Sequence, residues 1–205
     1  MFSGPVIDGA SVAILEFLYN HEEHGVLDSW RFLRVRSLSR FCMQVGKATV
    51  NDVDDLSVFF RRAWEESGPD SFGFTGVTQG TINEIASREF LQTRLRDPDV
   101  NIYVVKEESR VLGFASTRNI DRQTIELSGI IMLESATGRG FGTQLVEKAV
   151  SSARQAGFLK MVVKTEIANE RAIGFYKKIG FAEVGKAKEN VEGITVETLI
   201  LERPL

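Results

Sequence analysis

Cysteine is nearly absent from this chain of 205 residues, which has one cysteine, Cys42, together with four prolines and two histidines. A single thiol cannot form an internal disulfide, so we expect a reducing compartment. Cys42 falls in a predicted strand with no histidine expected nearby, which favours buried packing over a role as a nucleophile. The spacing of His21 and His24 indicates an exposed helix face more than a metal site.

Long apolar runs are also absent. The apolar stretch 12–19 is interrupted by Glu16, and no segment reaches the length of a membrane span. No Lys or Arg precedes Arg31, so the basic start of a signal peptide is missing too. We therefore expect a cytoplasmic protein with no membrane partner.

Neither sign of charge dominates: 25 Lys and Arg stand against 28 Asp and Glu, for a formal net charge of −3. This balance argues against a general nucleic-acid binder. Arginines alternate with apolar and aromatic residues between Trp30 and Phe41, but that pattern also suits an edge strand or a dimer contact. The hydrophobic share of 43% is that of an ordinary folded domain with a substantial core.

Glycine is concentrated at one informative place, the segment 136–143, in which Gly138, Gly140 and Gly142 alternate. The residues before it, 124–133, have the β-branched character of a mostly buried strand, and those after it have helical periodicity. The glycines therefore mark a strand-to-helix turn, where the first N–H groups of the helix are unpaired. Such a turn predicts a loop that binds phosphate groups. The alternative is that the glycines serve only the packing of the turn.

A second apolar run, 159–165, follows the helix, and after it comes the segment 169–181, NERAIGFYKKIGF. The order of strand, glycine loop, helix, strand, Asn, helix with Tyr, and Gly-Phe resembles the GCN5-related N-acetyltransferase (GNAT) family. Members of that family transfer acetyl from acetyl-coenzyme A to an amine. The resemblance extends over roughly 44–205 and is specific over 126–181. It implies acetyl-coenzyme A as co-substrate and no metal.

The family's glycine loop has Gln or Arg, two residues, Gly, one residue, and Gly or Ala. Gly140 and Gly142 match the small positions, so Thr137 stands where Gln or Arg is expected. Main-chain amides can bind a diphosphate without a guanidinium, and Arg139 could restore the positive charge. The resemblance therefore implies that the cofactor is bound by Thr137, Gly138, Arg139, Gly140, Phe141, Gly142 and Thr143. The Thr143 hydroxyl could also bond to the pyrophosphate; the alternative is that Thr143 is an ordinary residue at the start of the helix.

The chemistry requires a neutral amine, so a proton must leave an ammonium of pKa about 10.4, and an oxyanion must be stabilised. The resemblance implies that the strand 124–133 splays from the next one, which points to the amides of Ile131, Met132 and Leu133 as oxyanion donors and cofactor contacts. The sequence itself shows Gly129, which would permit a bulge there.

The base is sought among carboxylates or a water chain. Glu126 falls where the histone-acetylating branch of the family has its glutamate base, and in an alternating strand it shares a face with Ser128 and Ile130. A solvent-facing glutamate is the alternative. Glu134 and Glu166 are weaker candidates.

Tyr176 follows Asn169 by seven residues, or two helical turns, so both can face the cofactor. The resemblance implies that Tyr176 protonates the departing thiolate, and that Asn169 caps its helix and binds the pantetheine arm. A core aromatic and a plain N-cap are the alternatives. Gly180 and Phe181 predict a left-handed helix end with the ring packed under it.

The predicted fold class is α/β (α+β): a GNAT-like mixed, mostly antiparallel central sheet with helices on both faces. Residues 1–40 form a short N-terminal extension of unknown role with a helix at 12–24, and 41–205 form the domain. Within it we expect strands at 41–50, 101–106, 111–119, 124–133, 158–165, 181–186 and 194–202, helices starting at Asn51 or Asp52 and at 81–96, 142–156 and 169–179, and a loop at 67–80.

The function predicted from this pattern is direct acetyl transfer to a primary amine of a small molecule. The alternatives are a protein lysine or N-terminus as acceptor, and a regulatory module that binds coenzyme A without turnover, for which Thr137 is the support. The first two helices of the domain, the loop between them and the last hairpin are expected to select the acceptor. A homodimer is left open.

Overall fold

The computed structural model describes residues 43–68, 75–191 and 194–205, all within one contact unit, Ser39–Leu205. The predicted helix at 12–24, the basic and aromatic stretch at 30–41, both histidines and Cys42 lie outside the described residues. Within them, no helix is long and apolar enough to cross a membrane.

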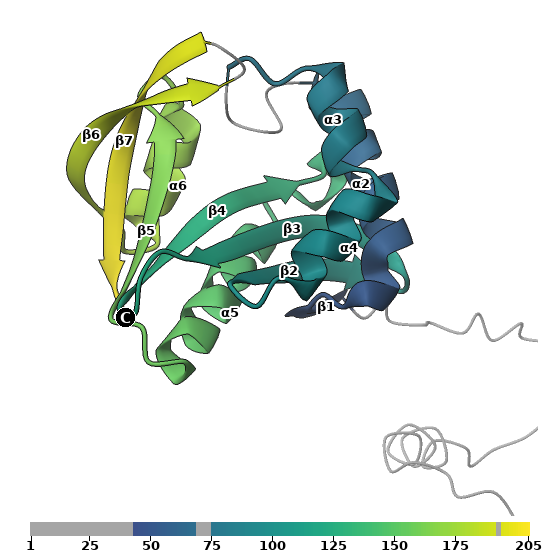
Figure 1. The fold of residues 1–205 in the computed structure, drawn as a ribbon, viewed down its shortest axis with the longest axis horizontal. Coiled ribbons are helices and arrows are strands. Elements are labelled where there is room, and N and C mark those ends of the chain that lie inside the picture. The colour runs from purple at the N-terminus through teal and green to yellow at the C-terminus, as the bar shows by residue number, and fades with distance from the viewer. Residues whose placement is uncertain (1–42, 69–74, 192–193) are drawn as a thin grey trace, which may run out of the picture. The chain divides into compact units, whose positions relative to one another are not determined.

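In the part of the chain that the structure describes, seven strands form one sheet in the order β1-β2-β3-β4-β5-β7-β6 (Figure 1). Every neighbouring pair is antiparallel except β4 and β5, which run parallel. The predicted mixed, mostly antiparallel sheet is therefore confirmed. The strands are β1 (Met43–Lys47), β2 (Val100–Glu107), β3 (Arg110–Asn119), β4 (Thr124–Met132), β5 (Lys160–Glu166), β6 (Ala182–Val191) and β7 (Ile194–Pro204).

Helices cover both faces of this sheet, which gives two cores. The pattern of β2 makes this possible, because Ile102 and Val104 join one buried cluster while Tyr103 and Val105 join the other. The first cluster packs against α2 (Val53–Ser67) and α4 (Arg88–Arg96), and the second packs against α5 (Phe141–Gln155) and α6 (Glu170–Lys178).

Helix α2 has Asp52 at its N-cap position, one of the two residues expected there, but the Asp52 side chain does not bond to the first turn of the helix. The side-chain cap lies one turn earlier, at Thr49, which begins the short 3-10 turn Val50–Asp52. The Thr49 hydroxyl accepts the Asn51 N–H, and the Asp52 carboxylate accepts the Thr49 N–H at 2.6 Å, so the two side chains form a capping box. The core positions predicted for this helix are all buried: Val53, Leu56, Phe59, Phe60 and Ala63.

The single helix predicted over 81–96 is wrong. Helix α3 (Gln79–Ile85) ends before Ser87, and α4 begins after it. Ser87 has extended backbone, and its hydroxyl accepts the N–H of Phe90 at 3.2 Å. Serine side chains compete with helical bonding and favour caps, so Ser87 starts a new helix in place of continuing the old one.

A β-bulge interrupts the pairing of β3 with β4, as Gly129 had suggested. Ser116 pairs with Gly129 and Thr117 pairs with Leu127, so Ser128 is the extra residue. The bulge reverses the alternation of β4. The expectation that Glu126 shares a face with Ile130 is therefore wrong, because Ile130 packs against the core formed by Leu127 and α5, whereas Glu126 faces the opposite side.

Candidate functional site

The strands β4 and β5 separate soon after they meet. They pair from Thr124↔Lys160 to Glu126↔Val162, and beyond this point no described residue pairs across them. In Figure 1 the two strands diverge from their shared end, with β4 turning toward α4 and β5 continuing beside β7 and α6. The facing edges of both strands are therefore left without a β partner, as the predicted splay requires.

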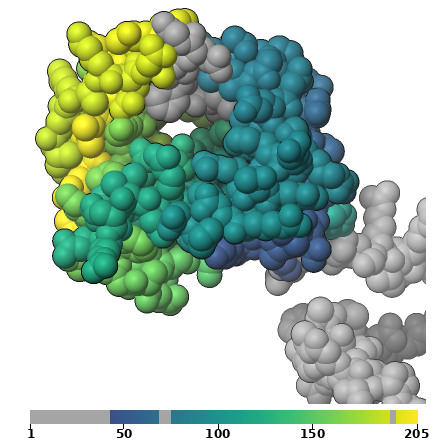
Figure 2. Space-filling model, in the orientation of Figure 1, coloured from purple at the N-terminus to yellow at the C-terminus, as the bar shows by residue number. Residues whose placement is uncertain are grey.

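A cavity of about 940 Å³ occupies this gap. Figure 2 shows the hollow above β4, between the C-terminal strands and the helices α3 and α4. Its lining comes from both sides of the sheet: the glycine loop, α5 and α6 on one side, and α2, α3 and α4 on the other. This volume lies at the upper end of the range typical of ligand pockets.

The glycine loop forms one end of the cavity. Gly138 and Gly140 have left-handed backbone, with φ of 75° and 81°. Gly140 is the N-cap of α5 and no side chain caps the helix, whose first internal bond runs from the Gln144 N–H to the Gly140 carbonyl at 3.1 Å. The N–H groups of the first turn, residues 141–143, therefore have no helical acceptor and can bind an anion.

Two side chains of this loop, those of Thr137 and Arg139, contact other parts of the loop region. The Thr137 hydroxyl donates to the Leu133 carbonyl at 3.2 Å, so it is engaged within the turn that precedes the loop. The Arg139 guanidinium stacks on Phe141, 5.1 Å from the ring centroid. Of the seven loop residues predicted to bind the cofactor, Arg139 and Phe141 do not line the cavity, and the other five do.

The edge of β4 beside the gap offers main-chain donors. The Leu133 N–H donates to the Leu112 carbonyl of β3 at 3.0 Å, so it is not available to a ligand. Because N–H directions alternate along a strand, the Ile131 amide also points to β3 and the Met132 amide points into the gap. Of the three amides predicted from the sequence, the geometry places that of Met132 at the cavity.

Tyr176 and Asn169, both expected to face the cofactor, line the cavity. Asn169 caps α6, since its side-chain oxygen accepts the Ala172 N–H at 3.0 Å, and its NH2 group stays available. Tyr176 is 5% exposed, and its ring contacts Phe175 and Phe181. Burial raises the pKa of Tyr176 far above its ordinary value, so the phenol is protonated at neutral pH.

The helix that carries Tyr176 ends as the sequence predicts. Gly180 has left-handed backbone with φ of 91°, and the Phe181 N–H bonds back to the Tyr176 carbonyl at 3.0 Å. The Phe181 ring is buried and lies 5.7 Å from the Tyr176 ring. The turn therefore fixes the position of the phenol.

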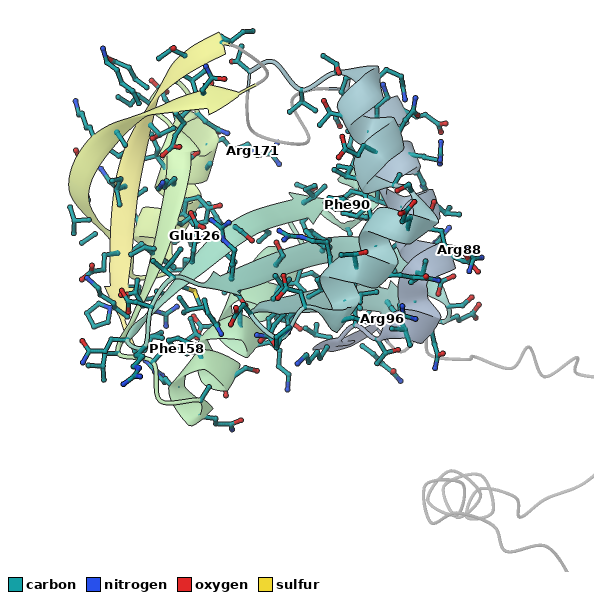
Figure 3. The ribbon with its side chains drawn as sticks, viewed as in Figure 1. Arg88, Phe90, Arg96, Glu126, Phe158 and Arg171 are labelled. Carbon is teal, nitrogen blue, oxygen red and sulfur yellow. The ribbon has the colours of Figure 1, made fainter. Side chains whose placement is uncertain are left out.

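The structure does not bring Glu126 to the cavity. It lies in the paired part of β4, 8% exposed, and its carboxylate bonds to the Arg118 guanidinium at 2.9 Å. Figure 3 shows it in the angle between β4 and β5. Glu166 is also engaged, because its carboxylate accepts the Thr75 hydroxyl at 2.9 Å. Glu134 lines the cavity and accepts the Ser67 hydroxyl at 3.1 Å.

Several lining residues were not identified from the sequence. Ser116 and Ser128 meet at the bulge with their hydroxyl oxygens 2.8 Å apart, and Phe90 and Arg94 of α4 form part of the opposite wall. Phe90 points toward the gap in Figure 3. Phe90 and Arg94 had one signal in the sequence, their spacing of four residues, which puts them on the same face of a helix. Ser116 and Ser128 had none. The last hairpin was expected to help select the acceptor. No described residue of β6 or β7 lines the cavity, contrary to that expectation.

Residues 57–181 match the model of the acetyltransferase (GNAT) family. This is more than half of the chain and includes the glycine loop, Asn169 and Tyr176. The chain therefore belongs to the GNAT family, and its class is that of the acetyl-coenzyme A-dependent N-acyltransferases. No curated protein is significantly similar to it in sequence.

Solved structures share this fold at low identity. The PaiA N-acetyltransferase of Thermoplasma acidophilum, in complex with coenzyme A, is 19% identical with a TM-score of 0.62, over 80% of this chain and 99% of that one. The ribosomal-protein-S5-alanine acetyltransferase of Vibrio fischeri is 16% identical with a TM-score of 0.65, over 79% and 92%. Similarity at this level establishes the fold and leaves the acceptor open.

We predict that Gly140→Ala weakens coenzyme A binding at least about tenfold, because alanine disfavours positive φ and the amides that follow would turn away from one another. The matched control is Gly157→Ala at the other end of α5, where φ is 88° and, as at Gly140, no atom lies within 4 Å of an added Cβ. Both variants should lose about 1–2 kcal/mol of stability. Calorimetric titration that finds equal affinity for the two would remove the loop from the site.

Proposed function

We propose that this protein transfers acetyl directly from acetyl-coenzyme A to a primary amine of a small molecule. The observation that carries the proposal is the gap between β4 and β5. It joins an uncapped helix N-terminus to a mostly apolar wall on α2 and α4, with a buried phenol between them. An elongated anionic donor and a small acceptor can therefore meet in the middle of one cavity.

The residues present fit coenzyme A. The unpaired amides of residues 141–143 and the positive end of the α5 dipole suit a diphosphate, and the left-handed glycines keep side chains out of its path. The Asn169 NH2 group and the free edge of β4 suit the amides of a pantetheine arm. Bound acetyl-coenzyme A supplies the thioester acyl group. The Thr137 hydroxyl is not needed for this contact, so its departure from the family pattern is compatible with binding.

The Met132 amide is the proposed donor to the carbonyl oxygen that becomes negative as the amine attacks. A fixed N–H in a site shielded from water stabilises such a charge without reorganising. In the reaction a C–N bond forms and a C–S bond breaks. The amine loses one proton, and the sulfur gains one.

The amine's proton leaves through water in this proposal. Among the described lining residues Glu134 is the one carboxylate, and none is a histidine. The hydroxyls of Ser116 and Ser128 lie at the bulge between the gap and the wall of α4, where they can hold a water beside the amine. Cationic side chains around the cavity lower the pKa of a bound ammonium, which reduces the need for a strong base.

Tyr176 is the proposed acid for the departing sulfur. We predict that Tyr176→Phe lowers kcat at least about tenfold and leaves the Kd of acetyl-coenzyme A within about twofold, because the phenyl ring keeps the packing and loses the proton. Tyr103→Phe is the control, since Tyr103 is buried in the same core and does not line the cavity. A parallel loss of kcat and affinity in Tyr176→Phe would mean that the ring only packs.

Glu126 as general base remains a prediction from the sequence, and its ion pair with Arg118 favours a structural role. We expect Glu126→Gln to keep the pH dependence of kcat/KM and to lower the melting temperature, because Arg118 loses its partner at 2.9 Å. Disappearance of the rising limb of the pH profile, with a loss of 100-fold or more, would make Glu126 the base after all.

An amine screen with thiol release as readout tests the function itself. We expect turnover with small primary amines and none with peptides that carry a free lysine or N-terminal alanine. Turnover of peptides alone would instead make a protein the acceptor, as for the ribosomal-protein-S5-alanine acetyltransferase that shares this fold. Binding of acetyl-coenzyme A without turnover of any amine would favour the regulatory module.

A further inference from the structure

The charges around the cavity are unequal in sign. The cationic side chains in its described lining are Arg94, Lys164, Arg171 and Lys178, against the single carboxylate of Glu134. Lys164 is paired with Glu189 at 2.6 Å, and Glu134 accepts from Ser67. Arg171 and Lys178 stand on α6 with Asn169 and Tyr176, the side assigned above to coenzyme A. Arg94 stands across the gap on α4.

Arg94 has no strong partner among the described residues. Its nearest carboxylate oxygen, on Asp97, is 4.0 Å away, beyond hydrogen-bond distance, and the other oxygen of Asp97 accepts the Asp99 N–H at 2.9 Å. The guanidinium lies 5.8 Å from the centroid of the Phe90 ring. By contrast, Arg62 and Arg118 bond to carboxylates at 2.7 and 2.9 Å. The N–H donors of the Arg94 guanidinium, which have no strong acceptor among the described residues, are suited to bind the carboxylate of a ligand.

The surface beside Arg94 is aromatic and aliphatic. Phe90 precedes it by one helical turn, and Leu91, Phe60 and Phe114 continue the wall, with the last two rings 5.0 Å apart. The described residues of this wall carry no carboxylate that would pair with a second positive charge, and the one carboxylate in the described lining, on Glu134, accepts from Ser67. An acceptor such as a polyamine or a lysine-rich peptide would face Arg94 and an apolar surface, and both disfavour it.

We propose that the acceptor is an amino acid: an amine that carries its own carboxylate, bound by Arg94, and an apolar side chain, bound by the wall of α2 and α4. This inference rests on the proposed function and names its substrate class. Binding the carboxylate at Arg94 and the side chain at Phe90 leaves the amine to face the bulge at Ser128 and the thioester beside Met132.

The test compares phenylalanine, leucine and methionine with their carboxamides, which differ from them by one charge. Steady-state kcat/KM is measured by thiol release for the wild type, Arg94→Gln and Arg96→Gln. Arg96 is the matched control because it belongs to the last turn of the same helix and does not line the cavity. Each substrate pair is used with all three proteins, so the difference in amine pKa within a pair cancels between them.

The quantity compared is the ratio of kcat/KM for the amino acid to kcat/KM for its carboxamide. We expect this ratio to be at least about tenfold higher in the wild type and in Arg96→Gln than in Arg94→Gln. Unchanged coenzyme A affinity and melting temperature in Arg94→Gln show that the variant is intact. An equal ratio in all three proteins overturns the inference. So does turnover of amines without any turnover of amino acids, which would leave the proposed function standing, whereas absence of turnover with every amine would end both.

Discussion

The early end of the pairing between β4 and β5 is the constraint on which the site depends. In a continuous sheet the main-chain groups of both strands would bond to one another. Here β5 takes β7 as its partner, β4 keeps β3, and the edges that face each other remain open. Open N–H groups in a partly buried position require an acceptor, from solvent or from a ligand. The structure therefore provides unused donors where the chemistry needs them.

Two local features help to keep this gap open and useful. The bulge at Ser128 increases the twist of β4 and exchanges its faces, so that Ile130 packs on α5 while Glu126 points to the other side. The glycine loop then starts α5 without a side-chain cap, at the end of the same strand. A strand edge and a helix N-terminus thus offer donors to one elongated ligand, and the phenol of Tyr176 lies in the wall between them.

Much of this could be predicted from the sequence, because the relevant signals are local. Glycines at 138 and 140 need positive φ, and both have it. Asn169 caps a helix, Tyr176 lies on the inner side of that helix, and Gly180 ends it, as residue types and spacing indicate. The family resemblance then connected these separate turns to one activity.

What could not be predicted from the sequence depends on one local helix cap and on contacts that form only in the folded sheet. The cap at Ser87 divides the segment 81–96 into two helices, where the spacing of apolar residues predicted one. The bulge in β4 puts Glu126 and Ile130 on opposite faces of the strand, whereas a regular strand would put them on the same face. The ion pair between Glu126 and Arg118 requires the register of β3 against β4. Arg94 is one of two basic residues in the last turn of α4, and only the tertiary structure shows that it borders the cavity.

Hydrogen exchange of individual amides by NMR, with and without coenzyme A, measures whether the open β4 edge and the α5 N-terminus bind the cofactor. Coenzyme A should slow exchange at Met132 and at residues 141–143, and leave exchange at the first amides of α4, Arg88 and Glu89, unchanged. Unaltered exchange at the β4 edge and the α5 N-terminus under saturating coenzyme A, or protection confined to another part of the domain, would contradict this expectation.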